Sequence, residues 1–232
     1  GCSDPAVLSK VASRMIGQLS EPLRLAGRQA QIGASIGIAV HPADGADAGS
    51  LLKSADTAMY QAKTGGRNGF RFFTAELAHD AARHFLLEGE LRQAIDRGEL
   101  RLHYQPKIDL ATSRMAGLEA LVRWQHPERG LLMPGDFIDL AEESGLIVPL
   151  GRWVMGEACR QVRQWREDGL EPPRCAINLS ARQLTSDGVV ADIQEALAAQ
   201  ALEAGALEVE ITESALMAEP ERAQQHLARL RE

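Results

Sequence analysis

The sequence has no apolar stretch approaching the roughly 18 to 20 residues that span a bilayer. The region 1–20 is also unlike a signal peptide, because Asp4, Lys10 and Arg14 interrupt the apolar core that such a peptide needs. The chain as given is therefore expected to be neither exported nor embedded. The sequence predicts a cytoplasmic location, and attachment of a longer parent to the inner membrane through other segments stays open.

Charge of one sign is not concentrated anywhere in the chain. The formal net charge is −7, and no run of five or more like charges occurs. This excludes a general electrostatic attraction to nucleic-acid polymers or to an acidic membrane face. An anionic ligand must then be held by local positive groups or by a cation.

Cysteine is scarce. Cys2, Cys159 and Cys175 are an odd number without the paired spacing of a disulfide framework or a zinc site. We expect reduced thiols, which agrees with the predicted cytoplasmic location.

What is present is a globular composition, 45% hydrophobic and 25% charged, long enough for one large domain or two small ones. Apolar spacing predicts an α+β unit over residues 1–73. Its expected helices cover 5–19 and 49–63, and its expected strands cover 23–25, 31–40 and 70–73.

Residues 74–98 predict a connecting helix, with Leu87, Leu91 and Ile95 on one face and Gly98 as its stop. A second unit, 99–232, alternates strands and helices, which favours a parallel βα sheet or barrel of the α/β class. We expect strands near 100–104, 114–121, 174–179 and 206–211, and helices near 135–144, 147–168, 189–203 and 219–232. These are about four strands, whereas a closed barrel needs eight, so we expect half a barrel and a chain cut at both ends.

Active sites of α/β barrels lie at the C-terminal ends of their strands. The residues expected there, in chain order, are Gln105, Glu119, Arg123, Asn178, Glu210 and Glu213. Glu119, Asn178 and Glu210 offer only oxygen atoms, which suit Mg²⁺ or Mn²⁺.

Each of these residues has a plainer interpretation. Glu119 and Arg123 can be ordinary ion-pair partners, and Asn178 can cap a turn. Gln105 and Glu213 can be exposed polar or capping residues. Glu208 shares a strand face with Glu210 and shows that acid at this spacing need not bind metal. Spacing and chemistry alone leave a metal site open.

Four segments, taken in order, resemble the successive motifs of EAL-domain cyclic di-GMP phosphodiesterases, and the likeness continues through 134–138 and 141–145. They are Tyr104-Gln105-Pro106, Glu119-Ala120-Leu121-Val122-Arg123-Trp124, Asn178-Leu179-Ser180 with Arg182-Gln183, and Glu210-Ile211-Thr212-Glu213-Ser214.

This resemblance implies a modified TIM barrel that hydrolyses cyclic di-GMP to pGpG with two divalent cations. It assigns Glu119, Asn178 and Glu210 to metal binding and catalysis. Arg123 would contact the phosphate, Gln105 a guanine, and Glu213 would steady a neighbouring loop. The family's next motifs lie beyond Glu232, so we expect the chain alone to be inactive.

The first unit resembles the C-terminal half of a GGDEF diguanylate cyclase domain. The similar segments are Ala34-Ser35-Ile36-Gly37-Ile38-Ala39, Ala55-Asp56-Thr57-Ala58-Met59-Tyr60-Gln61-Ala62-Lys63 and Gly66-Arg67-Asn68. The resemblance implies that Lys63 and Arg67 contact GTP phosphates. At i and i+4, a generic solvated basic face is the alternative.

The leading hypothesis is the cyclic di-GMP phosphodiesterase region of a tandem GGDEF–EAL protein. A module that senses GTP or cyclic di-GMP without turnover is the alternative, and a diguanylate cyclase with a regulatory EAL half is the third. A homodimer of the full-length parent stays open.

Overall fold

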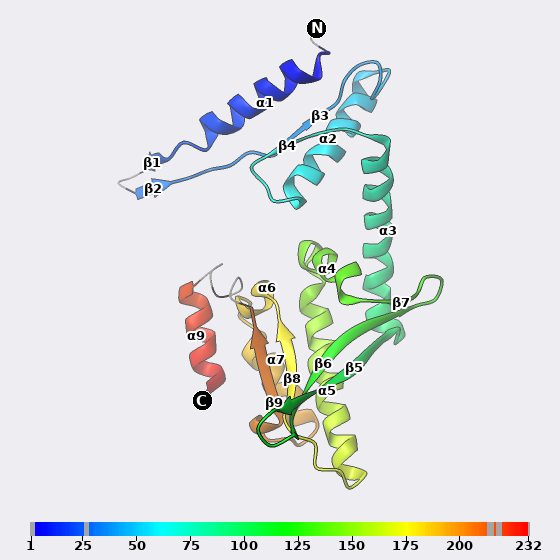
Figure 1. Ribbon diagram of the computed structural model, residues 1–232, viewed down its shortest axis with the longest axis vertical. Helices are drawn as coiled ribbons and strands as arrows, with labels where there is room; N and C mark the ends of the chain where they lie inside the picture. The colour runs from blue at the N-terminus through cyan, green and yellow to red at the C-terminus, as the bar shows by residue number, and fades with distance from the viewer. Residues whose placement is uncertain (1–2, 26–27, 213–215, 217–219, 232) are drawn as a thin grey trace. The chain divides into compact units, whose positions relative to one another are not determined.

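The computed structural model describes residues 3–25, 28–212, 216 and 220–231. The chain divides into two compact units, unit 1 over Gly1–Leu86 and unit 2 over Leu87–Glu232, with the division inside helix α3 (Ala75–Arg97) (Figure 1). Among the helices of the described residues, none has the length and apolar character needed to cross a membrane.

Unit 1 combines two long helices with two small sheets. Asp4 caps α1 by accepting the Ala6 N–H at 2.9 Å, and a reciprocal pair of Asp47 and Ser50 caps α2. Strands β1 and β2 pair antiparallel, and β3 pairs parallel with β4. The elements are α1 (Pro5–Leu19), β1 (Leu23–Leu25), β2 (Arg28–Ala30), β3 (Ile36–Ile38), α2 (Ala48–Thr64) and β4 (Phe70–Phe72).

The predicted strand over 31–40 is wrong in its extent. Only Ile36–Ile38 forms a strand, because β4, its partner, is equally short, and β2 lies before the predicted range. The turn that precedes β4 carries Asn68, whose side-chain oxygen accepts the Ser20 hydroxyl at 2.9 Å and the Ala34 N–H at 3.4 Å. Asn68 therefore joins the end of α1 to the segment before β3.

Unit 2 is built on one sheet in the order β5-β6-β8-β9, with β7 paired to β6. Strands β6, β8 and β9 are parallel, and α5 and α7 pack on one face of the sheet (Figure 1). Its elements after α3 are β5 (Leu100–Asp109), β6 (Arg114–His126), β7 (Gly130–Leu132), η1 (Pro134–Asp136), α4 (Ile138–Ser144), α5 (Ile147–Glu167), β8 (Cys175–Leu179), α6 (Ala181–Leu184), α7 (Val189–Ala199), η2 (Ala204–Ala206), β9 (Leu207–Ile211) and α9 (Pro220–Arg231).

The expected parallel order is wrong for β5, which pairs antiparallel with β6. The connection between them is a tight turn in which the Asp109 carboxylate accepts the N–H groups of Ala111 and Thr112, both at 2.8 Å. A parallel pair would need a crossover of about a dozen residues or more. The short connection therefore makes this pair a hairpin.

The core between the sheet and its helices contains two of the three cysteines. Cys159 and Cys175 are free and fully buried. Burial raises the pKa of each thiol to about 11, so both stay protonated and unreactive at neutral pH. This agrees with the expected reduced thiols, and Cys2 lies outside the described residues.

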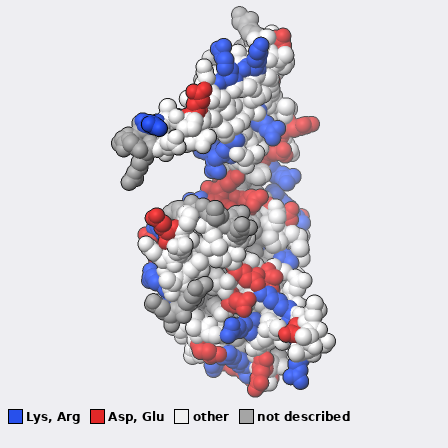
Figure 2. Space-filling model, turned by 60° about the vertical axis from the view of Figure 1, so that its left-hand side comes forward, with Lys and Arg blue, Asp and Glu red and all other residues white. Residues whose placement is uncertain are grey.

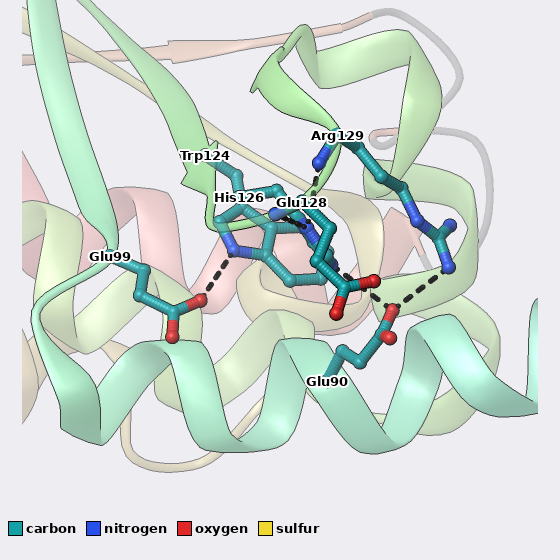
Figure 3. A network of polar contacts seen from close by, with 6 residues as sticks. All are labelled: Glu90, Glu99, Trp124, His126, Glu128 and Arg129. Atoms are coloured by element: carbon teal, nitrogen blue, oxygen red, sulfur yellow. Dashed lines mark hydrogen bonds and ion pairs between the residues drawn. The ribbon is translucent and has the colours of Figure 1, made fainter.

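A polar network fastens the second half of α3 to the β6–β7 hairpin (Figure 3). The His126 side chain, 3% exposed, accepts the backbone N–H groups of Glu128 and Arg129 at Nδ1, at 3.1 and 3.2 Å. Because Nδ1 accepts, Nε2 carries the proton and donates to Glu90 Oε2 of α3 at 3.2 Å. Arg129 also contacts that oxygen at 3.1 Å, so one carboxylate oxygen holds both side chains.

His126→Ala is expected to lower the free energy of unfolding of unit 2 by about 2 to 4 kcal/mol. The change removes a ring that packs on Trp124, with a centroid distance of 5.0 Å, and leaves two backbone N–H groups without their acceptor. Urea unfolding followed by tryptophan fluorescence measures it, because all three tryptophans lie in unit 2. Arg129→Gln, at a side chain 32% exposed, is the control and should cost less than about 1 kcal/mol. Equal stability of the His126→Ala and unchanged chains would contradict this role.

Candidate active site

The strand register brings four of the expected site residues to one face of the sheet. Gln105 of β5 lies opposite Glu119 of β6, and Asn178 of β8 lies opposite Glu210 of β9. Glu119 is in register with Ala176, which is two residues from Asn178 and shares its face. This face is opposite the one covered by α5 and α7, where Ala120, Ile177 and Leu179 enter the core.

Two of these side chains are in direct contact. Asn178 Nδ2 donates to Glu119 Oε1 at 2.8 Å. For Asn178 to share a cation with that carboxylate, its amide would have to turn so that Oδ1 replaces the NH₂ group. A rotation about the last side-chain bond achieves this without moving the strand.

The donor chemistry of Glu119, Asn178 and Glu210 fits a hard divalent cation. All three supply oxygen, from three adjacent parallel strands. Within the described ranges, no group of three or more His, Cys, Asp or Glu side chains could hold a metal ion. A cation at this face would therefore depend on the Asn178 amide as well as the two carboxylates.

A lysine that sequence reasoning missed lies at the same face. Lys107 Nζ contacts Glu210 Oε1 closely and Glu208 Oε1 at 3.4 Å. Its pKa is raised, mainly by the hydrogen bond to Glu210. The predicted first strand ended at 104, whereas β5 continues to Asp109. Side chains alternate between the two faces of a strand, so a predicted strand that reached residue 107 would have placed Lys107 on the same face as Gln105.

Three expected positions need correction. Glu119 and Arg123 lie within β6, and Gln105 lies within β5, because the hairpin pairing continues past the predicted strand ends. Arg123 Nη1 donates to the Val122 carbonyl oxygen at 2.8 Å. Glu213 lies outside the described residues.

In unit 1, Lys63 and Arg67 are both exposed, but they do not share a helix face. Lys63 is in the last turn of α2, which ends at Thr64. Arg67 lies in the following turn with a φ of 56°. Both side chains are exposed to solvent, as the alternative interpretation expects, and their contact with GTP phosphates stays a prediction.

A cavity of about 400 Å³ opens next to the site face, within the range of small-molecule pockets. Asn178 lines it together with Ser180 and Gln183, and its walls include apolar residues of β6, α4 and α5. Glu142 of α4 also lines it, and burial raises the pKa of this carboxyl group. Asn178, a predicted metal ligand, therefore lies in the wall of a mostly apolar cavity.

Short helix α6 shapes this recess and was not expected from the sequence. Ser180 and Gln183 cap it reciprocally, and Arg182 Nη1 donates to the Glu142 carbonyl oxygen near the end of α4. Gly151 of α5 makes room for Gln183, since a Cβ there would lie 1.7 Å from Gln183 Nε2. The segment 178–183 thus links β8 to both helices that wall the cavity.

Charge over the molecule is mixed. On the part of unit 2 visible in Figure 2, acidic and basic side chains both occur among uncharged ones. This agrees with the absence of like-charged runs in the sequence. Recognition of an anion at the site would then depend on individual groups such as Arg123 and on a bound cation.

Comparison with known proteins decides the family. The EAL domain model matches residues 88–232. The chain belongs to the EAL domain family. A second family model, the GGDEF domain of diguanylate cyclases, matches residues 2–69. Both resemblances noted in the sequence are confirmed.

Among curated relatives, this EAL-family chain is 44% identical over 214 residues to the bifunctional diguanylate cyclase/cyclic di-GMP phosphodiesterase MucR of Pseudomonas aeruginosa. It is 44% identical over 212 residues to the cyclic di-GMP phosphodiesterase PdeR of Escherichia coli K12. The matches cover 92% and 91% of the chain but 31% and 32% of those proteins. The chain thus spans about a third of these relatives.

Solved structures show the same fold. The PaMucR phosphodiesterase in complex with c-di-GMP matches with a TM-score of 0.60 and 44% identity, over 63% of this chain and 59% of that one. The EAL enzyme Bd1971, bound to cAMP and cyclic di-GMP, matches with a TM-score of 0.59 and 31% identity, over 66% and 42%. The EAL-type α/β fold expected for unit 2 is confirmed.

Proposed function

We propose that the EAL unit belongs to an enzyme that hydrolyses cyclic di-GMP to linear pGpG with Mg²⁺ or Mn²⁺. The observation that carries this proposal is the contact of Asn178 with Glu119, beside Glu210 on the next strand. These are the three residues that the family resemblance assigns to the metal. The named activities of MucR and PdeR support the same reaction.

Each expected site residue has a chemical role in this proposal. Glu119, Asn178 and Glu210 hold the cation, which when bound supplies Lewis acidity toward water and the phosphodiester. Arg123 binds the phosphate, for which a planar guanidinium offers two parallel hydrogen bonds.

The remaining assignments stay predictions. Gln105 would lie beside a guanine, and Glu213 would steady the neighbouring loop. Lys63 and Arg67 would contact GTP in unit 1. A cytoplasmic location and a homodimer of the parent are likewise predictions.

The test uses this chain extended through a complete EAL domain, called here the extended protein. Incubated with cyclic di-GMP and Mn²⁺, it should form pGpG, as measured by liquid chromatography, and a chelator should stop the reaction. The 232-residue chain alone should form none. Binding of cyclic di-GMP without product would favour the sensing module instead, and cyclic di-GMP made from GTP would favour the cyclase.

A further inference from the structure

One ammonium group is shared by two carboxylates at the site face. Lys107 of β5 contacts both Glu208 and Glu210 of β9, which are two residues apart and lie on the same strand face. Only Glu210 is assigned to the metal. Lys107 Nζ contacts Glu210 Oε1, and Glu208 Oε1 lies 3.4 Å from the same Nζ.

A divalent cation that binds Glu210 competes with the Lys107 ammonium group for the negative charge of one carboxylate. Lys107 Nζ contacts Glu210 Oε1, so a cation bound to this carboxylate lies beside the ammonium group. Two positive charges at adjacent positions repel each other, and the repulsion weakens as the ammonium group moves away. Metal binding is therefore favoured when Lys107 can move from Glu210 to another acceptor.

We propose that Glu208 receives Lys107 when a cation binds Glu210. Lys107 then acts as a competing cation that neutralises Glu210 in the metal-free site, and Glu208 acts as a positioning residue that sets the metal affinity. This inference rests on the proposed function of Glu210 as a metal ligand. It adds that Lys107 and Glu208 set the affinity of the site for the cation.

Stability alone gives a weak reason for this arrangement. The side chains are partly exposed, 34% for Lys107, 45% for Glu208 and 34% for Glu210. Ion pairs exposed to this degree contribute little to folding, because solvent screens them and the lysine side chain loses freedom. Movement of Lys107 between Glu210 and Glu208 gives each carboxylate a role, whereas a fixed ion pair would need only one of them.

The experiment measures the affinity of the extended protein for Mn²⁺ without substrate, by electron paramagnetic resonance of free Mn²⁺. Lys107→Met removes the competitor and should tighten binding about three- to tenfold. Glu208→Gln removes the alternative partner and should weaken binding by a similar factor. The double variant should bind like Lys107→Met, because no ammonium group is left to relocate.

Arg163→Met is the matched control. It also removes one positive charge, from an exposed ion pair with Glu167 on α5, and should leave Mn²⁺ affinity unchanged. Lys107→Gln repeats the test with a polar side chain, and tryptophan fluorescence confirms that each variant is folded.

The outcomes separate this inference from the proposed function. If Mn²⁺ binds and binding requires Glu119, but Glu208→Gln binds as tightly as the unchanged protein, the exchange is wrong and the site assignment stands. A change in the same direction for Lys107→Met and Glu208→Gln also overturns the exchange. Absence of saturable Mn²⁺ binding overturns both.

Discussion

Glu119→Ala in the extended protein should abolish Mn²⁺-dependent hydrolysis of cyclic di-GMP, with a loss on the order of a thousand-fold or more in kcat/KM. A ligand carboxylate both binds the cation and fixes its position, so its removal takes away the activation of water. The change also leaves Asn178 Nδ2 without its 2.8 Å acceptor. Steady-state kinetics over a range of Mn²⁺ concentrations measure the loss, and the low activity should persist at saturating metal.

The contrast between Glu210 and Glu208 is the control for this prediction. Both lie on one face of β9 and both contact Lys107. Asn178→Ala and Glu210→Ala should act like Glu119→Ala, whereas Glu208→Ala at saturating Mn²⁺ should retain most activity. Arg123→Ala should chiefly raise KM. Equal losses at Glu208 and Glu210 would point to a weakened strand, and normal activity after Glu119→Ala would end the metal assignment.

Helices of this chain could be predicted closely because their signals are local. Apolar spacing gives the observed bounds of α1 and gives the end of α2 within one residue. Strands β2 and β7 and helix α6, each of three or four residues, were missed. Strands β5 and β6 were cut short, since pairing with a partner strand extends them past their apolar residues.

The position of Glu119, Asn178 and Glu210 on neighbouring strands was predicted, but their contacts were not, and their role as a site stays a prediction. Motif order and strand alternation were enough to expect Glu119, Asn178 and Glu210 together. Lys107 reaches residues more than a hundred positions away, and His126 pairs with Glu90 across 36 positions. Such contacts depend on how the β5–β6 hairpin packs against β9 and α3, which cannot be predicted from a single sequence.

Gly37→Ala should lower the free energy of unfolding of unit 1 by about 3 kcal/mol or more. A Cβ at Gly37 would lie 1.9 Å from the Ala55 carbonyl oxygen and 2.3 Å from the Met59 N atom. Both are backbone atoms of α2, so no side-chain rotation relieves the clash, and the helix must move off β3. Hydrogen exchange followed by mass spectrometry should show lost protection across β3 and α2.

Gly17→Ala is the matched control within the same unit. Gly17 lies inside α1, and nothing is within 4 Å of the position of an added Cβ. Alanine there should raise helix stability by about 0.5 to 1 kcal/mol, because glycine loses more backbone freedom on folding. The two substitutions add the same methyl group and should act with opposite sign. If α2 stays as well protected in Gly37→Ala as in Gly17→Ala, the close approach of α2 to β3 is wrong.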